Sequence, residues 1–193
     1  MKICVFCASS ETIEKSYLQS GEQFGKMLAE HGDTLVFGAG KYGVMGAVAR
    51  GIRRKGGSAV GVIPTFFNEV DVTFTDCELI YTDTMRERKQ IMEDLSDAFV
   101  MMPGGIGTFE EFFEILTLKQ LRRHTKPIVI YNVNGYYNPL FRLIDEAIEK
   151  NFMADKCREL YFVTDSAEKV FEHLDSYRPI LYNKYDFLEK EEE

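Results

Sequence analysis

Basic residues are scarce in this sequence. The chain has 193 residues, with 23 Lys and Arg against 31 Asp and Glu, so its formal net charge is -8. Nucleic acids and anionic membrane surfaces are bound by dense patches of Lys and Arg, so this charge balance argues against both as partners. An anionic ligand must therefore be held locally, by a site built for it.

Long apolar runs are also missing. The first residues, MKICVFCASS, contain one Lys and a short apolar run that cannot form the core of a signal peptide. No other stretch of the sequence reaches the length of a membrane span. We therefore expect a cytoplasmic protein that does not enter a membrane.

Cysteine and histidine are few, with four and three residues. Cys4 and Cys7 spell C-x-x-C, but KICVFC is typical of a β-strand, in which residues three apart point to opposite faces. We interpret all four cysteines as small buried hydrophobic residues in a reducing compartment. His31, His124 and His173 are isolated and no zinc-binding spacing is present, so we expect no metal site.

What the sequence does contain is an alternation of short apolar runs with longer amphipathic ones. Hydrophobic residues make up 45% of the chain, enough for one well-packed domain. The predicted strands are 2–7, 34–38, 58–63, 78–82, 97–102, 127–131 and 160–163. The predicted helices are 14–31, 43–55, 84–95, 108–123, 138–150 and 166–176. Apolar strands separated by helical crossovers predict an α/β fold, a Rossmann-like doubly wound and mostly parallel sheet with helices on both faces.

We expect this fold to occupy a single domain over residues 1–177. The remaining segment, 178–193, turns polar and acidic after Pro179. We interpret it as a C-terminal tail that is either solvated or packed on a neighbour.

A first glycine-rich loop, GAGKYGVMG, contains G-x-G-x-x-G from Gly38 to Gly43. A dinucleotide site requires this motif after the first strand and an acidic residue about 20 residues further on. Here the loop follows the second predicted strand, and the next strand ends in GVIP without an acid. Two interpretations stay open: glycine serves tight helix–sheet packing, or the amides of Gly40 to Gly43 bind a phosphate or ribose edge.

A second glycine-rich loop lies in MMPGGIGTFEEFFE, residues 101–114. Its three glycines expose the backbone, and Thr108 is placed to cap the helix that follows. Free amides, a hydroxyl group and the positive end of a helix dipole form an anion site that needs no basic side chain. A plain strand-to-helix turn needs fewer glycines, so we favour phosphate binding by Gly104, Gly105, Ile106, Gly107 and Thr108.

The helix after this loop has two predicted contact faces. One face, suited to the core, carries Phe109, Phe112, Phe113 and Leu116. The other, suited to a second subunit or a site, carries Glu111, Glu114, Leu118 and Leu121. Glu111 has two interpretations: it completes a capping box with Thr108, or it meets a cationic part of a ligand.

The helix before this strand, TMRERKQIMEDL, places Arg88 in the middle of an apolar arc formed by Met85, Ile91, Met92 and Leu95. Such an Arg either extends its charged end to solvent or awaits a carboxylate or phosphate. Lys89 lies at the edge of the arc, as a second contact or a solvated cation.

These residues carry a resemblance to a known family. PGGIGTFEE fits the motif PGGxGTxxE, and MRERKQIM fits the Arg-Lys half of the signature that precedes it. The likeness extends from residue 1 to about 175 and includes VFCASS, FGAGKYGVMGAVA and NVNGYYNPL. The sequence resembles the LOG (LONELY GUY) family of cytokinin riboside 5'-monophosphate phosphoribohydrolases, which activate cytokinins.

The resemblance implies a Rossmann-like nucleotide-binding homodimer, or a larger homo-oligomer, with its site near the subunit interface. It implies hydrolysis of the N-glycosidic bond of a nucleoside 5'-monophosphate, AMP or a cytokinin-type nucleotide, to free base and ribose 5-phosphate without a cofactor. Arg88 and Glu111 would be the catalytic pair. The substrate-binding residues would be the 104–108 loop together with Lys89, Gly40, Gly43, Met85 and Ser9.

The sequence departs from the family pattern at two places. Gly38-Ala39-Gly40 replaces three glycines, and Arg86 stands where a His is usual. Similar sequences are often named lysine decarboxylases, but no segment resembles a pyridoxal-phosphate site. Two other functions stay open: a nucleotide-binding carrier or regulator of the same fold without hydrolytic activity, and a dinucleotide-dependent oxidoreductase. The sequence does not specify the base.

Overall fold

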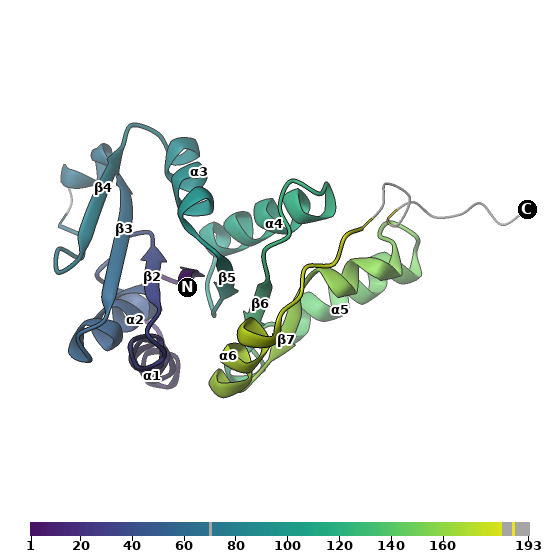
Figure 1. Ribbon diagram of the computed structural model, residues 1–193, viewed down its shortest axis with the longest axis horizontal. Coiled ribbons are helices and arrows are strands. Elements are labelled where there is room, and N and C mark those ends of the chain that lie inside the picture. Colours follow the sequence, from purple (N-terminus) through teal and green to yellow (C-terminus); the bar gives the residue numbers. More distant parts are fainter. Residues whose placement is uncertain (70, 183–186, 188–193) are drawn as a thin grey trace, which may run out of the picture.

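The structure is a computed structural model and describes residues 1–69, 71–182 and 187. Seven parallel strands form one sheet in the order β4-β3-β2-β1-β5-β6-β7 (Figure 1). Their bounds are β1 Lys2–Phe6, β2 Thr34–Phe37, β3 Ser58–Pro64, β4 Glu78–Thr82, β5 Ala98–Met101, β6 Ile128–Tyr131 and β7 Phe162–Thr164. The predicted doubly wound α/β sheet is confirmed.

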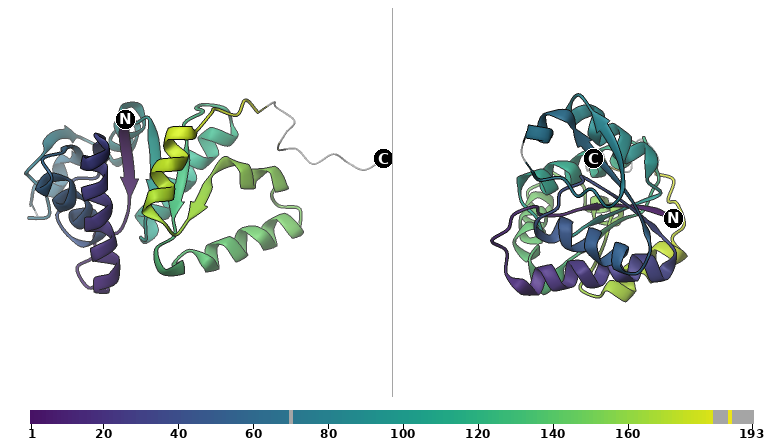
Figure 2. Two further views of the ribbon diagram at one scale, coloured as in Figure 1. Left: turned by 60° about the horizontal axis from the view of Figure 1, so that its bottom comes forward. Right: turned by 90° about the vertical axis from the view of Figure 1, so that its left-hand side faces the viewer.

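Helices cover both faces of this sheet (Figure 2). The α-helices are α1 Lys15–His31, α2 Gly43–Arg54, α3 Met85–Leu95, α4 Ile106–Gln120, α5 Asn138–Glu149 and α6 Ala167–Ser176. Short 3-10 helices, which the sequence did not predict, are η1 Thr65–Glu69, η2 Val133–Gly135 and η3 Asp155–Leu160. In the described part of the chain, no helix has the length and apolar character needed to cross a membrane.

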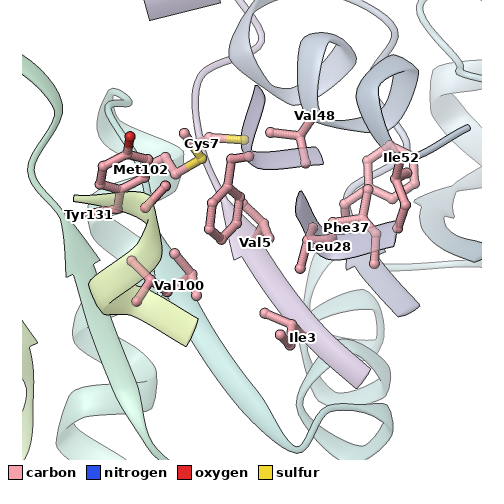
Figure 3. Close-up of a cluster of buried hydrophobic side chains, with 14 of the residues drawn as sticks. Ile3, Val5, Cys7, Leu28, Phe37, Val48, Ile52, Val100, Met102 and Tyr131 are labelled. Atoms are coloured by element: carbon pink, nitrogen blue, oxygen red, sulfur yellow. The ribbon is translucent and has the colours of Figure 1, made fainter. Parts of the chain in front are cut away.

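The core is divided by the sheet into two hydrophobic clusters. One cluster joins the strands to α1, α2 and α6, and part of it is shown in Figure 3, where Cys7 and Val5 of the β1 segment lie near Val48 of α2. The other joins the strands to α3, α4 and η3. Cys7 belongs to the first cluster and Cys4 to the second, and all four cysteines are free, so the C-x-x-C spelling does not bring two sulfurs together.

The α4 helix differs from its prediction. It begins at Ile106 rather than at 108, its N-cap residue is Gly105, and no side chain caps it. Thr108 therefore lies inside the first turn, and the predicted capping role of Thr108 is wrong. The two predicted faces also shift by part of a turn: Phe113, expected in the core, is 39% exposed, whereas Glu111, expected on the outer face, is buried.

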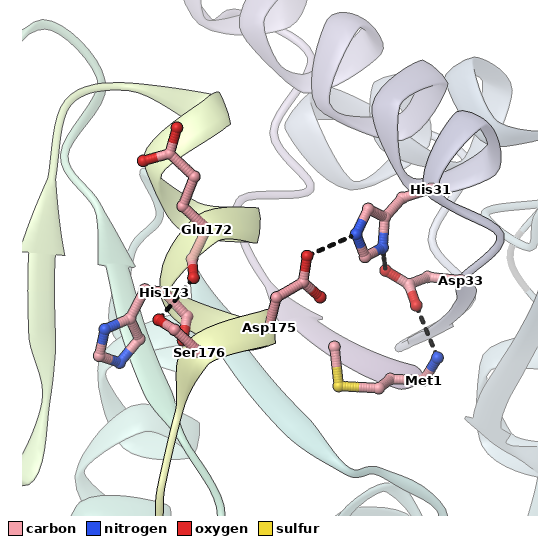
Figure 4. Close-up of polar contacts among 7 residues, drawn as sticks. All are labelled: Met1, His31, Asp33, Glu172, His173, Asp175 and Ser176. Carbon is pink, nitrogen blue, oxygen red and sulfur yellow. Dashed lines mark hydrogen bonds and ion pairs between the residues drawn. The ribbon is translucent and has the colours of Figure 1, made fainter.

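The amino ends of the strands carry a polar network centred on Asp33 and His31 (Figure 4). Asp33, whose side chain is 2% exposed, receives the Met1 ammonium group on Oδ1 at 2.6 Å and contacts His31 Nδ1 through Oδ2 at 2.8 Å. The other ring nitrogen of His31 meets Asp175 of α6 at 3.1 Å. Burial alone would lower the pKa of His31, but hydrogen bonds to Asp175 and Asp33 outweigh burial and raise it.

Most of the predicted tail, 178–193, lies outside the described residues. In its described part, Leu181 is exposed, whereas Tyr182 is buried in the cluster on the α4 side of the sheet. The hydroxyl group of Tyr182 donates to the Glu159 carbonyl oxygen at 3.1 Å. The chain is thus packed on its own domain at least as far as Tyr182.

Candidate active site

A cavity of about 490 Å³ lies at the carboxyl ends of the strands. The strand order reverses its direction between β1 and β5, and open α/β sheets bind ligands at such a switch point. Loops that follow β1, β2 and β5 line the cavity. Of the predicted site residues, it brings together Ser9, Gly40, Met85, Arg88, Gly105, Ile106, Gly107, Thr108 and Glu111. Gly43, Lys89 and Gly104 are not among its lining residues.

A buried ion pair forms one wall of the cavity. Arg88 Nη1 of α3 donates to Glu111 Oε1 of α4 at 3.0 Å, and the two side chains are 8% and 7% exposed. Arg88 Nε donates to the Val62 carbonyl oxygen of β3 at 3.0 Å. The α3 helix that carries Arg88 starts at a capped turn, because the Thr84 hydroxyl accepts from Glu87 N. The two hydrogen bonds of Arg88 therefore join α3 to β3 and to α4.

The environment of Glu111 changes its acidity. Burial raises the pKa of the Glu111 carboxyl, and the attraction of Arg88 lowers it by less, so the net direction is upward. Glu111 thus takes up a proton more readily than an exposed Glu. A buried carboxyl group with a shifted pKa in a cleft is a candidate for proton exchange with a ligand.

The loop after β5 presents its backbone to the cavity. A Cβ atom on Gly105 or Gly107 would meet no atom within 4 Å, so the surface over these two residues is open. Gly104 is different, because a Cβ there would lie 2.1 Å from Thr108 Oγ1. Gly104 therefore lets Thr108 pack against the loop, and Thr108 and the first turn of α4 face the cavity. The positive end of the α4 dipole at this place suits an anion.

Two tyrosines to which the sequence analysis gave no part in the site hold this loop. Tyr136 donates from its hydroxyl group to the Gly104 carbonyl oxygen at 2.8 Å. Tyr137 donates in the same way to the Met102 carbonyl oxygen at 2.8 Å and is 1% exposed. Both lie in NGYYNPL, a segment that carried the family resemblance, and that likeness was the available signal.

Another part of the cavity wall comes from η1 and the segment after it, where Phe67 and Val72 line it. This segment is joined to the first glycine loop by two backbone hydrogen bonds, from Lys41 N to Val72 O at 2.8 Å and from Phe74 N to Ala39 O at 2.7 Å. The sequence analysis missed this wall, because its residues carry no motif.

The first glycine loop uses its glycines largely for packing. The Gly40 amide donates to Met45 Sδ at 3.2 Å, although Gly40 does line the cavity. Gly43 has a φ angle of 61° and a Cβ there would lie 2.6 Å from the Ala8 carbonyl oxygen. These contacts favour the packing interpretation over phosphate binding by the amides of Gly40 to Gly43.

Lys89 of α3 forms ion pairs with α4 and does not line the cavity. Its ammonium group forms ion pairs with Glu110 and, at 2.8 Å, with Glu114 of α4. Burial alone would lower the pKa of Lys89, but these two carboxylates outweigh burial and raise it. Lys89 therefore fastens α3 to α4 beside the Arg88–Glu111 pair.

Known proteins resemble this chain over most of its length. A protein-family profile described as "Possible lysine decarboxylase" matches residues 45–174. The lysine that lines the cavity, Lys41, is a poor candidate for a Schiff-base amine, because its ion pair with Asp71 at 2.6 Å raises its pKa. The curated relatives carry a different name from the profile.

A cytokinin riboside 5'-monophosphate phosphoribohydrolase of Arabidopsis thaliana is 37% identical over 92% of this chain and 83% of its own. A probable enzyme of the same name from Oryza sativa is 39% identical over 93% of this chain and 79% of its own. Among solved structures, the molybdenum cofactor binding protein of Rippkaea orientalis has a TM-score of 0.69 and 23% identity, covering 91% of this chain and 95% of that one. That likeness concerns the fold alone. The identity shared with the plant enzymes, over nearly the whole domain, shows that this chain belongs to the LOG family.

Proposed function

We propose that this protein hydrolyses the N-glycosidic bond of a nucleoside 5'-monophosphate, giving a free base and ribose 5-phosphate. The observation that carries the proposal is the buried Arg88–Glu111 pair, which lines the same cavity as the open glycine loop after β5. The names of the curated relatives, cytokinin riboside 5'-monophosphate phosphoribohydrolases, support the same reaction.

In this reaction the C1'–N bond breaks and its electron pair leaves with the base, which takes up a proton. Positive charge then develops on the ribose, as in glycoside hydrolysis. The Glu111 carboxylate stabilises this charge and accepts a proton from the water that adds to C1'. The raised pKa of Glu111 makes its carboxylate a stronger base toward this water than the carboxylate of an exposed Glu. Arg88 holds the carboxylate and contacts the ligand.

The 5'-phosphate binds at the loop of residues 104–108. The amides of this loop and the α4 dipole supply the attraction, so no basic side chain is required there. Binding energy from the phosphate fixes the ribose against Glu111, although the phosphate itself does not react. Ser9, Gly40 and Met85 contact the rest of the nucleotide, whereas Gly43, Gly104 and Lys89 support the site from behind.

We also propose that the protein is a homodimer or a larger homo-oligomer. Along α4 and its C-cap residue, Ile106, Phe113 and Leu121 are 86%, 39% and 60% exposed. A single domain has no need to expose such a stripe of apolar side chains, and a second copy would cover it. Ile106 also lines the cavity, so a second copy on this stripe would border the site. A monomer by light scattering at micromolar concentration would contradict this part of the proposal.

A cytoplasmic location completes the proposal. The four cysteines are free and three of them are buried, which suits a reducing compartment.

The test is base release. The protein is incubated with a panel of nucleoside 5'-monophosphates, AMP and N6-substituted AMP among them, and with the matching nucleosides. We expect free base from the monophosphates and much slower release from the nucleosides. Tight binding of AMP without release of adenine would instead identify a nucleotide carrier or regulator. Equal turnover of adenosine and AMP would remove the phosphate role of the 104–108 loop.

A further inference from the structure

Arg88 leaves one nitrogen for the cavity. Nε donates to Val62 O and Nη1 donates to Glu111 Oε1, and in the part of the chain that the structure describes these are the guanidinium nitrogens with protein hydrogen bonds. Nη2 lies beside Gly38, at the end of β2, where both residues line the cavity. Nη2 is therefore the nitrogen of Arg88 that has both of its N–H groups available to a ligand.

Gly38 makes this position possible. A Cβ atom on Gly38 would lie 1.8 Å from Nη2 and 3.0 Å from Cζ of Arg88, and its next neighbour, Met45 Cε, would be 3.4 Å away. The backbone of Gly38 is not among those with positive φ, so an alanine would fit it without backbone strain. The need for glycine at this place comes from Arg88.

The guanidinium group cannot move aside at low cost. It is planar, and two of its three nitrogens are held at 3.0 Å, by a strand carbonyl and by a buried carboxylate. Tilting Nη2 away from a new methyl group must therefore bend or break one of these two hydrogen bonds. By contrast, a Cβ atom on Gly40 would meet Met45 Sδ at 2.8 Å, at the end of a flexible side chain that can turn away.

We propose that Gly38 is a positioning residue for the reaction: its missing side chain leaves a niche that holds Arg88 Nη2 at the cavity wall and keeps Nη1 on Glu111. This inference rests on the proposed function. The proposed function requires the Arg88–Glu111 pair; the inference adds that Gly38, at the end of β2, fixes the plane of the guanidinium group.

The experiment is Gly38→Ala, measured with AMP. We expect kcat to fall by about a hundredfold, because a displacement on the order of 1 Å at a reacting group has this effect. The 104–108 loop is untouched, so KM should rise by less than about fivefold. Gly21→Ala is the matched control: its Cβ would lie 3.0 Å from Val44 Cγ1 in the contact of α1 with α2, and we expect unchanged kcat and KM.

A double-mutant cycle with Arg88→Lys isolates the niche. Lysine has no Nη2, so adding Gly38→Ala to the Arg88→Lys variant should change the AMP dissociation constant and the Tm very little. In the wild-type background the same substitution should lower the Tm and weaken AMP binding. Interaction between residues in contact is what such a cycle measures.

Two results would overturn the inference: Gly38→Ala keeping kcat within about threefold of wild type, or equal losses of Tm and AMP affinity with and without Arg88→Lys. If the wild-type protein releases no base from any nucleoside monophosphate, the proposed function fails. The Tm values and AMP dissociation constants of the double-mutant cycle still test whether Gly38 accommodates Arg88 Nη2.

Discussion

Two buried charge networks, one at the amino ends of the strands (the amino edge) and one at their carboxyl ends (the carboxyl edge), differ in how fully they are hydrogen-bonded. At the amino edge, both oxygens of Asp33 and both ring nitrogens of His31 have protein partners. At the carboxyl edge, one nitrogen of Arg88 and one oxygen of Glu111 take part in their ion pair, and the described residues give no partner to Arg88 Nη2 or Glu111 Oε2. Both of these side chains line the 490 Å³ cavity, and the residues of the amino-edge network are not among its lining residues.

This difference distinguishes charged residues that stabilise the fold from charged residues that can bind a ligand. A buried polar group that is fully hydrogen-bonded contributes to a unique fold, and it has nothing left with which to bind a ligand. A charged pair that borders a cavity and has a donor and an acceptor to spare can bind a ligand there. The unequal use of hydrogen-bonding capacity in these two charge networks therefore favours the Arg88–Glu111 pair as the place where a ligand binds.

The largest effect that we expect is from Glu111→Gln. The amide oxygen of Gln can still accept from Arg88 Nη1, so the Tm should stay near wild type and AMP should still bind. Loss of the negative charge beside the developing cation should cost about 3 kcal/mol or more, at least a hundredfold in the rate of adenine release. Arg88→Ala should be inactive as well and should bind AMP more weakly.

Glu111→Gln with most of its base-releasing activity retained would show that Glu111 is not the catalytic carboxylate. A large loss of Tm in that variant would place Glu111 with the structural charges, as at the amino edge.

Substitution of Gly107 should have opposite effects on ligand binding and on stability at the 104–108 loop. A side chain at Gly107 has space, so Gly107→Ala should fold normally. In Gly107→Asp, the new carboxylate at the start of α4 should stabilise the helix by about 0.5 kcal/mol, while repelling the phosphate and raising the KM for AMP about tenfold relative to Gly107→Ala. The comparison uses Tm and initial rates of both variants. Equal KM values would place the phosphate elsewhere.

The tyrosines behind the loop should matter to a smaller extent. Tyr137→Phe leaves the buried Met102 carbonyl oxygen without its donor, so the free energy of unfolding should fall by about 1.5 kcal/mol. Tyr136 is more exposed and water can replace its hydroxyl group, so Tyr136→Phe should cost about 0.5 kcal/mol. Urea denaturation of both variants checks the order, and a larger loss in Tyr136→Phe would contradict it.

The smallest effect is expected at the amino edge and depends on pH. The folded pKa of His31 is raised, so its contribution is fully present below the pKa of the unfolded chain, about 6.5, and is lost as the pH rises through the folded pKa. His31→Gln should therefore lower the free energy of unfolding by about 0.5–1 kcal/mol at pH 5.5 and by less at pH 8.5. The kcat at pH 7.5 should not change. A loss of activity without a loss of stability would mean that this edge is not purely structural.

The sheet was predictable because each strand and helix is encoded locally. Six of the seven strand predictions agree with the structure to within one residue at each end. The seventh, 160–163, starts two residues before β7 and overlaps η3, whose last residue is Leu160. The start of α4 was misplaced, because a threonine after three glycines has the form of a cap although the helix already begins at Ile106.

The site was only partly predictable, for a different reason. The motifs identified Arg88, Glu111 and the loop after β5, but their mutual contact depends on residues distant in the chain. The sequence could not show that Gly38 accommodates Arg88 or that Val72 lines the cavity. Nor could it show that two tyrosines donate hydrogen bonds to the backbone of the loop after β5. Each of these contacts appears only once the strand order has been established.

The connection that carries Arg88 has a consequence for the order of assembly. It runs from β4, at one edge of the sheet, past β3, β2 and β1 to β5 on the other side of the switch point, and it is the crossover that joins the two halves of the sheet. Arg88 touches the first half through Val62, and Glu111 belongs to the helix that follows β5. Neither half alone can form the charged pair. A chain that is still emerging from the ribosome, or one with a half unfolded, therefore lacks this pair, and the proposed site is complete only in the fully folded molecule.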